Sequence, residues 1–273
     1  MRRMLALTLA AAAVLSAGQA DDPYNYPIAV PRLEFAPTVD GNLAEWRDHA
    51  FSDGVWDIAR IAKSPWYDPA RNRLTRHGDE PSADEDLAAR YFIAWDDEYL
   101  YLGAEVRDNV NDGADPAHEP KRWYYKDAIC WFIEAPRNHV AKNFGEGDNA
   151  FCFVIDTQRP PYAAWWRHGA PGKTYIEEPI PAKAVDYSIK MSGHQADFTL
   201  EARVAMKATL GASSPSWRAP TVGDLYGLEI IHTDPDGGDY GGHFIIYGTG
   251  DDDSTWGSMK LAPPSGPIER KSN

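Results

Sequence analysis

RYFIAWDDEYLYLGAEVRD, residues 90–108, contains two runs of alternating side chains joined by a short acidic turn. In the first run Tyr91, Ile93 and Trp95 alternate with Phe92 and Ala94, and the second run repeats this pattern from residue 99 onward. Period-two alternation on both sides of a short polar turn predicts a β-hairpin.

Similar runs, separated by Gly, Pro, Asp and Asn, recur along the chain, whereas helical periodicity is scarce. This pattern predicts an all-β fold, an antiparallel β-sandwich of jelly-roll type with two long loop insertions. The loops are expected at 63–86 and 157–183, and short helical turns after Asp40 and Ala205. Besides the hairpin, strands are expected at 32–35, 55–61, 128–134, 151–156, 185–191, 197–204, 225–232, 243–247 and 257–261.

The first twenty residues have the three parts of a secretory signal peptide: Arg2 and Arg3, an apolar run, and small residues before a cleavage point after Ala20. We therefore expect a periplasmic or secreted protein with one sandwich domain over residues 21–262 and a disordered tail over 263–273. The formal net charge of −14 disfavours nucleic acid as a partner. Beyond the signal peptide no apolar segment is long enough for membrane insertion.

Cys130 and Cys152 lie in neighbouring strand-like runs. If these runs form a hairpin whose loop centres near residues 140 and 141, the two side chains face each other. An oxidising compartment permits a disulfide there, and two buried thiols are the alternative.

Several separated segments resemble, in order, the family 9 carbohydrate-binding modules. They are PTVDGNLAEW (37–46), the hairpin with its closing Val106-Arg107-Asp108, YYKDAICWFIE (124–134), DFTLEARV (197–204) with Leu210-Gly211, GLEIIHTDPDGG (227–238) and WGSMKL (256–261). The resemblance implies a β-sandwich that binds sugars by aromatic stacking and often carries structural calcium. The chain departs from the family pattern at Ala205-Met206, which replaces a proline, and at Cys130, which replaces an acidic residue. Residues 248–253 also lack the family's second stacking ring.

Rings and polar residues gather in two segments that suit a saccharide, because sugar C–H faces pack on rings while hydroxyls need polar partners. In the first segment, residues 123–127, the resemblance gives Tyr124 the stacking position, and the alternative is that the rings only cover the end of the sandwich. The second segment, residues 165–167, lies in the expected loop at 157–183. Its rings would either replace the second stacking ring that residues 248–253 lack, or only pack onto the sheet. The candidate ligand-binding residues are Trp123, Tyr124, Tyr125, Lys126, Asp127, Trp165, Trp166 and Arg167; Trp66 and Tyr67 are weaker candidates.

Asp234, Asp236 and Asp239 place oxygen ligands at alternate positions beside glycines, which is typical of a calcium loop. A plain Asp-Gly turn is the alternative. We expect no organic cofactor.

The sequence thus predicts a secreted, non-catalytic protein that binds oligo- or polysaccharide in polysaccharide recognition or breakdown. One alternative is a glycoside hydrolase on the same sandwich, with carboxylates drawn from Glu134, Glu201 and Glu229. Another is a periplasmic haem domain using His194, His232, Met191 or Met206, although the chain has no C-x-x-C-H motif.

Overall fold

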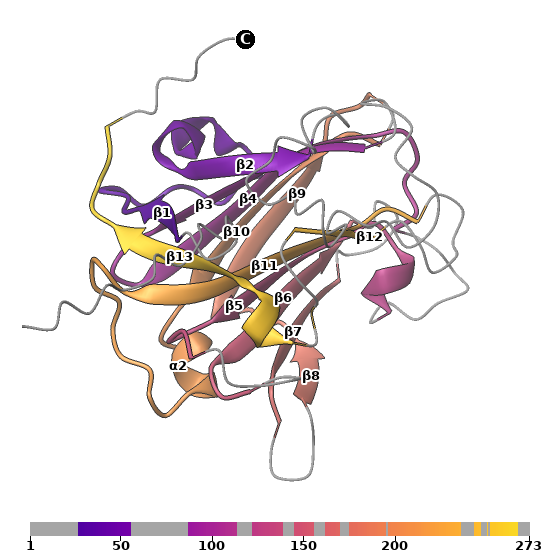
Figure 1. Ribbon diagram of the computed structural model, residues 1–273. Coiled ribbons are helices and arrows are strands. Elements are labelled where there is room, and N and C mark those ends of the chain that lie inside the picture. Colours follow the sequence, from indigo (N-terminus) through magenta and orange to yellow (C-terminus); the bar gives the residue numbers. More distant parts are fainter. Residues whose placement is uncertain are drawn as a thin grey trace, which may run out of the picture.

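The computed structural model is a sandwich of two β-sheets (Figure 1). It describes residues 27–55, 87–113, 122–138, 145–155, 162–169, 175–194, 196–235, 243–246, 250 and 252–266. The expected signal peptide, the loop at 63–86 and the residues Trp66, Tyr67, Asp236 and Asp239 lie outside these ranges. Among the described residues, no helix has the length and apolar character needed to cross a membrane.

The larger sheet has the strand order β1-β13-β11-β5-β6-β7-β8, and β12 also pairs with β11. All its pairings are antiparallel except β1 with β13. Its strands are β1 (Ile28–Pro31), β5 (Ala128–Glu134), β6 (Asp148–Val154), β7 (Ala163–His168), β8 (Tyr175–Pro179), β11 (Leu225–Thr233), β12 (His243–Ile245) and β13 (Gly257–Ala262).

The smaller sheet has the order β2-β3-β4-β10-β9, and every pairing in it is antiparallel. Its strands are β2 (Phe51–Val55), β3 (Leu87–Trp95), β4 (Tyr99–Asp108), β9 (Val185–Met191) and β10 (Phe198–Ala205). The predicted hairpin is confirmed as β3 and β4, with Trp95 opposite Leu100 at the turn.

The side-chain alternation of β5 divides the molecule into a core and an outer layer. Ile129, Trp131 and Ile133 enter the core between the sheets, while Cys130 and Phe132 belong to a second apolar cluster. Because successive strand residues point to opposite faces, this second cluster lies on the outer face of the larger sheet.

A third apolar cluster lies on the outer face of the smaller sheet. There the N-terminal segment, with the short helices η1 (Leu43–Glu45) and η2 (Arg47–His49), packs Trp46 against Phe92 and Tyr101. Glu201 of β10 anchors this segment, since its carboxylate accepts hydrogen bonds from the Asp40 and Gly41 amides and from the Trp46 indole.

Most expected elements are confirmed. Strands 128–134 and 185–191 have the predicted bounds, and the helical turns after Asp40 and Ala205 are present as η1 and as the turn leading into α2 (Leu210–Ser213). The first strand runs over 28–31, before the predicted 32–35.

The prediction of a loop throughout 157–183 is wrong, because residues 163–168 and 175–179 form β7 and β8. The prolines and glycines around the short run AAWWRH favoured a loop, and the alanines of the run are weak strand formers.

Candidate functional site

A row of aromatic rings crosses the outer face of the larger sheet. Trp123, Tyr124 and Tyr125 come from the helix η3 (Trp123–Tyr125), and Trp166 and Tyr175 come from β7 and β8; we call these five residues the outer aromatic row. The ring-centroid distances are 5.0 Å for Tyr125–Tyr124, 5.7 Å for Tyr124–Trp123, 6.2 Å for Trp123–Trp166 and 4.6 Å for Trp166–Tyr175. The five rings therefore form one continuous chain of contacts.

Small side chains beneath the row form its floor. Ala128, Ala150 and Ala164 belong to the same outer cluster as Trp123 and Trp166. Cys130 and Cys152 lie directly opposite each other on β5 and β6 and are joined by a disulfide. This small-residue floor leaves room for indole and phenol rings to lie on the sheet.

The two adjacent tryptophans of β7 point to opposite faces of the sheet. Trp165 is buried in the core, stacks on Phe151, and donates a hydrogen bond from Nε1 to Asn149 Oδ1 at 2.9 Å. Trp166 joins the outer aromatic row and is half-buried. Arg167 lies on the Trp165 side, with its guanidinium 5.0 Å from that ring centroid and paired to Glu178. Of these three predicted site residues, the structure places only Trp166 on the outer face.

Lys126 and Asp127, predicted beside the rings, are both buried. Lys126 Nζ donates to the Gly113 carbonyl at 3.3 Å. Asp127 takes part instead in a cluster of three carboxylates at one end of the sandwich.

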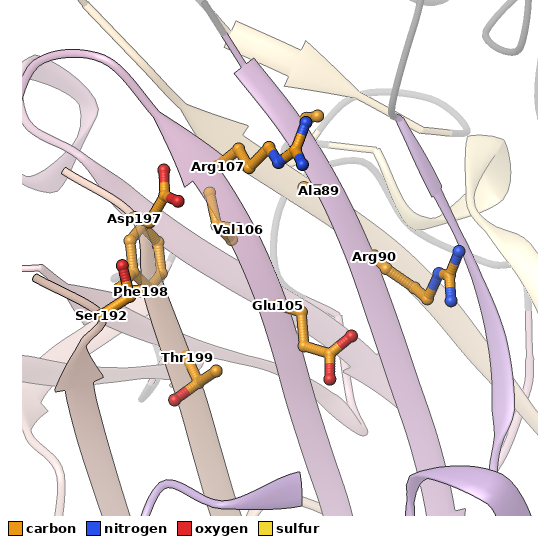
Figure 2. Close-up of a pocket in the computed structure, with 10 residues that line it drawn as sticks. Ala89, Arg90, Glu105, Val106, Arg107, Ser192, Asp197, Phe198 and Thr199 are labelled. Atoms are coloured by element: carbon orange, nitrogen blue, oxygen red, sulfur yellow. The ribbon is translucent and has the colours of Figure 1, made fainter. Parts of the chain in front are cut away.

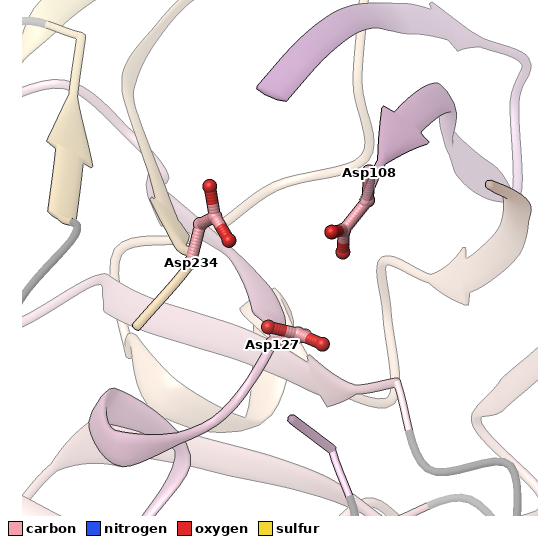
Figure 3. Close-up of side chains that lie close together, drawn as sticks. All are labelled: Asp108, Asp127 and Asp234. Atoms are coloured by element: carbon pink, nitrogen blue, oxygen red, sulfur yellow. The ribbon is translucent and has the colours of Figure 1, made fainter. Parts of the chain in front are cut away.

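That cluster consists of Asp108, Asp127 and Asp234, and Figure 3 shows their carboxylates converging. One oxygen of each lies within 4.8 Å of the others, and all three residues are buried. Asp108 ends β4, while Asp127 precedes β5 and Asp234 follows β11, the strand paired with β5. The cluster therefore joins the two sheets.

The hydrogen bonds of Asp127 leave part of its carboxylate available. Oδ2 accepts from Asn111 Nδ2 and the Asp112 amide, but the buried Oδ1 has no hydrogen-bond partner among the described residues. Burial, and then the charges of Asp108 and Asp234, raise the pKa of Asp127 well above its usual value. A cation would relieve this repulsion.

The donor set fits a hard metal ion, because three carboxylates supply the oxygen ligands that calcium prefers. Sequence reasoning identified Asp234 as a metal residue but grouped it with Asp236 and Asp239, which lie outside the described residues. It missed Asp108 in this role, although Asp108 closes the hairpin in the segment Val106-Arg107-Asp108.

A groove of about 580 Å³ lies on the other sheet, among β3, β4 and β10 (Figure 2). Its charged lining includes Arg90, Glu105, Arg107 and Asp197, and its ring, Phe198, is buried in the core. The described residues that line this groove therefore offer no exposed ring for stacking.

The carboxylates considered for catalysis all have partners within the fold. Glu134 pairs with Arg137, Glu201 holds the N-terminal segment, and Glu229 accepts from the Ile230 and Ile246 amides. These contacts favour structural roles.

The histidines considered as haem ligands are His232 and His194. His232 is buried with Nδ1 2.8 Å from the Tyr91 hydroxyl, and burial lowers its pKa to about 3. His194 is exposed beside Asp197. The two histidines thus occupy different environments.

Comparison with solved structures shows the same fold. A family 9 carbohydrate-binding module from Caldicellulosiruptor kristjanssonii in complex with cellotriose has 16% identity and a TM-score of 0.56, covering 90% of this chain and 99% of the module. The glucose complex also gives 16% and 0.56, with 89% and 100% coverage. A Bacteroides uniformis protein gives 10% and 0.51, with 86% and 97% coverage.

No curated protein sequence matches the chain. The family model described as "Carbohydrate family 9 binding domain-like" matches residues 58–263, which is most of the sequence. The chain therefore belongs to the carbohydrate family 9 binding domain-like family.

Proposed function

We propose that this protein binds oligo- or polysaccharide on the outer aromatic row. The observation that carries the proposal is the unbroken chain of rings from Tyr125 to Tyr175. Trp123 is buried, Tyr124, Tyr125 and Trp166 are half-buried, and Tyr175 is exposed. A row with a fixed base and accessible outer rings suits the apolar faces of consecutive sugar units.

Polar groups beside the row would engage the sugar hydroxyls. Glu177 lies opposite Trp166 on β8, and Tyr162 is hydrogen-bonded to it. A carboxylate next to stacking rings combines the two kinds of contact that sugar sites use, apolar faces and a few placed polar groups.

The structurally similar modules crystallised with cellotriose and glucose make β-glucans the first ligands to test. We propose that the protein acts in the recognition or breakdown of such polysaccharides after secretion. The disulfide in the described fold is consistent with an oxidising, extracytoplasmic compartment.

We also propose that calcium occupies the Asp108–Asp127–Asp234 cluster. Bound there, the ion would supply positive charge between three buried carboxylates and hold the ends of β4, β5 and β11 together. The cluster shares no residue with the outer aromatic row. Its proposed role is therefore to stabilise the fold around the binding face.

The test is titration calorimetry with cello-oligosaccharides and a panel of soluble glycans. Tyr124→Ala, Trp166→Ala and Tyr175→Ala should each weaken binding about tenfold, which corresponds to about 1.4 kcal/mol. Tyr99→Ala, on the other sheet, is the matched control and should bind like the wild type. Unchanged affinity in all three variants would show that the sugar binds elsewhere.

A further inference from the structure

A second cluster of buried carboxylates lies at the opposite end of β5. Glu134 ends that strand, Asp148 faces it at the start of β6, and Asp253 begins the helix η4 (Asp253–Thr255). One oxygen of each lies within 4.8 Å of the others, and all three residues are at most 1% exposed. Glu134 lies seven positions after Asp127 along the extended strand, a span of roughly 23 Å. The two clusters are therefore independent.

The guanidinium of Arg137 satisfies one member of this cluster. Its Nη1 donates to Glu134 Oε2 at 2.5 Å and to the Asp253 carbonyl at 3.0 Å, and its Nη2 donates to the Trp256 carbonyl. The other Glu134 oxygen, Oε1, accepts from the Asn138 amide. Both oxygens of Glu134 thus have hydrogen-bond donors, and its charge is balanced by Arg137.

Asp148 is different, because only one of its carboxylate oxygens has a hydrogen-bond donor within the described part of the chain. Oδ2 accepts from the Gly145 amide at 2.6 Å, but Oδ1 is buried and has no hydrogen-bond partner among the described residues. Burying a carboxylate oxygen without a hydrogen-bond partner costs free energy, because the oxygen loses its hydrogen bonds to water and no protein donor replaces them. The unpartnered oxygen therefore points to a bound ligand that is not part of the protein chain.

The charge balance identifies the class of ligand. Glu134, Asp148 and Asp253 are three acids beside one guanidinium, so two negative charges remain when all three are ionised. A divalent cation supplies that charge, and carboxylate and carbonyl oxygens are the ligands that calcium takes.

We infer that Glu134, Asp148 and Asp253 form a second divalent-cation site, with calcium as its ion. Asp148 and Asp253 would be the principal ligands, and Arg137 would position Glu134. The ion would connect the end of the β5–β6 hairpin to η4, which leads directly into β13. This site goes beyond sugar binding and does not depend on it.

Metal stoichiometry tests the inference. The full-length protein is stripped with a chelator, dialysed against calcium, and analysed by atomic emission and native mass spectrometry. We expect two ions per chain for the wild type and one for Asp148→Asn. Asp127→Asn should also retain one ion, and the double variant none. Asp97→Asn removes an exposed carboxylate and is the matched control, with two ions expected.

The outcomes separate this site from the Asp108–Asp127–Asp234 cluster. A wild type with one ion, lost in Asp127→Asn and kept in Asp148→Asn, would overturn the second site and leave the first. If Asp148→Asn fails to fold, the wild type and Asp127→Asn decide alone. Two ions in the wild type and one in Asp127→Asn support the inference, whereas one ion in the wild type and none in Asp127→Asn refute it. Sugar affinity is measured in parallel and should be unchanged in folded Asp148→Asn.

Discussion

Trp166 and Tyr175 lie face to face on β7 and β8, with ring centroids 4.6 Å apart and ring planes inclined by 2°. They are diagonal neighbours, because Trp166 is opposite Glu177 and Tyr175 is opposite His168. Trp166 thus supports one face of the more exposed Tyr175 ring. The arrangement fixes an aromatic surface at one end of the outer aromatic row.

If Tyr175 contributes a stacking surface, its ring matters more than its hydroxyl. Tyr175→Phe should keep sugar affinity within about twofold of the wild type, whereas Tyr175→Leu should lower it about tenfold, a loss of about 1.4 kcal/mol. Calorimetry with the best glycan from the panel measures both. Equal losses in the two variants would instead assign the contribution to the hydroxyl.

The adjacent tryptophans of β7 should contribute to different properties, Trp165 to stability and Trp166 to sugar binding. Trp165→Ala removes a core indole and its hydrogen bond to Asn149, so it should lower the free energy of unfolding by about 3–5 kcal/mol. Trp166→Ala should cost less stability but weaken sugar binding. Urea unfolding and calorimetry on both variants separate the effects; a large affinity loss in folded Trp165→Ala with full affinity in Trp166→Ala would contradict the assignment.

Strands with strong alternation could be read directly from the sequence. β5 and β9 were predicted to the residue, because large apolar side chains recur at every second position of β5 and turn residues bound both strands. β7 could not be recognised in the same way. Its inward and outward tryptophans are adjacent, its other outward positions hold an alanine and a histidine, and prolines flank it.

The acidic clusters depend on tertiary structure and were therefore harder to predict. Asp127 and Asp234 become neighbours only because Ala128 pairs with Thr233, and Asp108 joins them from the other sheet. Local spacing instead favoured Asp234 with Asp236 and Asp239. The facing positions of the two cysteines could be predicted because they lie on consecutive strands of one hairpin, whose pairing sets their register.

Removal of calcium should destabilise the protein through the Asp108–Asp127–Asp234 cluster. A bound ion whose free concentration is a hundred times its dissociation constant stabilises the folded state by about 2.7 kcal/mol. The wild type should therefore melt roughly 5 °C or more higher in calcium than in chelator. Asp127→Asn should show a smaller calcium-dependent shift, measured by differential scanning calorimetry, while Asp97→Asn keeps the full shift. Equal shifts in wild type and Asp127→Asn would argue against an ion at this cluster.

Glu201 should be required for the N-terminal segment to dock on the smaller sheet. Glu201→Gln replaces one acceptor oxygen by an amide donor, which faces either the Asp40 and Gly41 amides or the Trp46 indole. The expected loss of unfolding free energy is about 1–3 kcal/mol. Glu105→Gln, whose partner Arg47 is partly exposed, should cost less than about 1 kcal/mol. If urea unfolding shows comparable losses of unfolding free energy in the two variants, Glu201 has no special role in docking the N-terminal segment.

Gly227 lies directly opposite Glu134 on β11, where the second acidic cluster leaves no room for a side chain. A Cβ atom at this position would lie 2.5 Å from Arg137 Nη1 and 2.8 Å from Glu134 Cβ. Arg137 cannot easily yield, because its side chain is 3% exposed and bonded to Glu134 and to two carbonyls. Gly227→Ala should therefore destabilise the fold by about 1–3 kcal/mol.

The same substitution should also lower the affinity of the second cation site, since it displaces the arginine that positions Glu134. Gly223→Ala is not a suitable control, because Gly223 has a φ of +99°. Gly266→Ala is suitable, since no atom of the described residues lies within 4 Å of its added Cβ. Urea unfolding and calcium titration of both variants measure the effects. A Gly227→Ala protein with wild-type stability would show that Arg137 can move away from Glu134 at little cost.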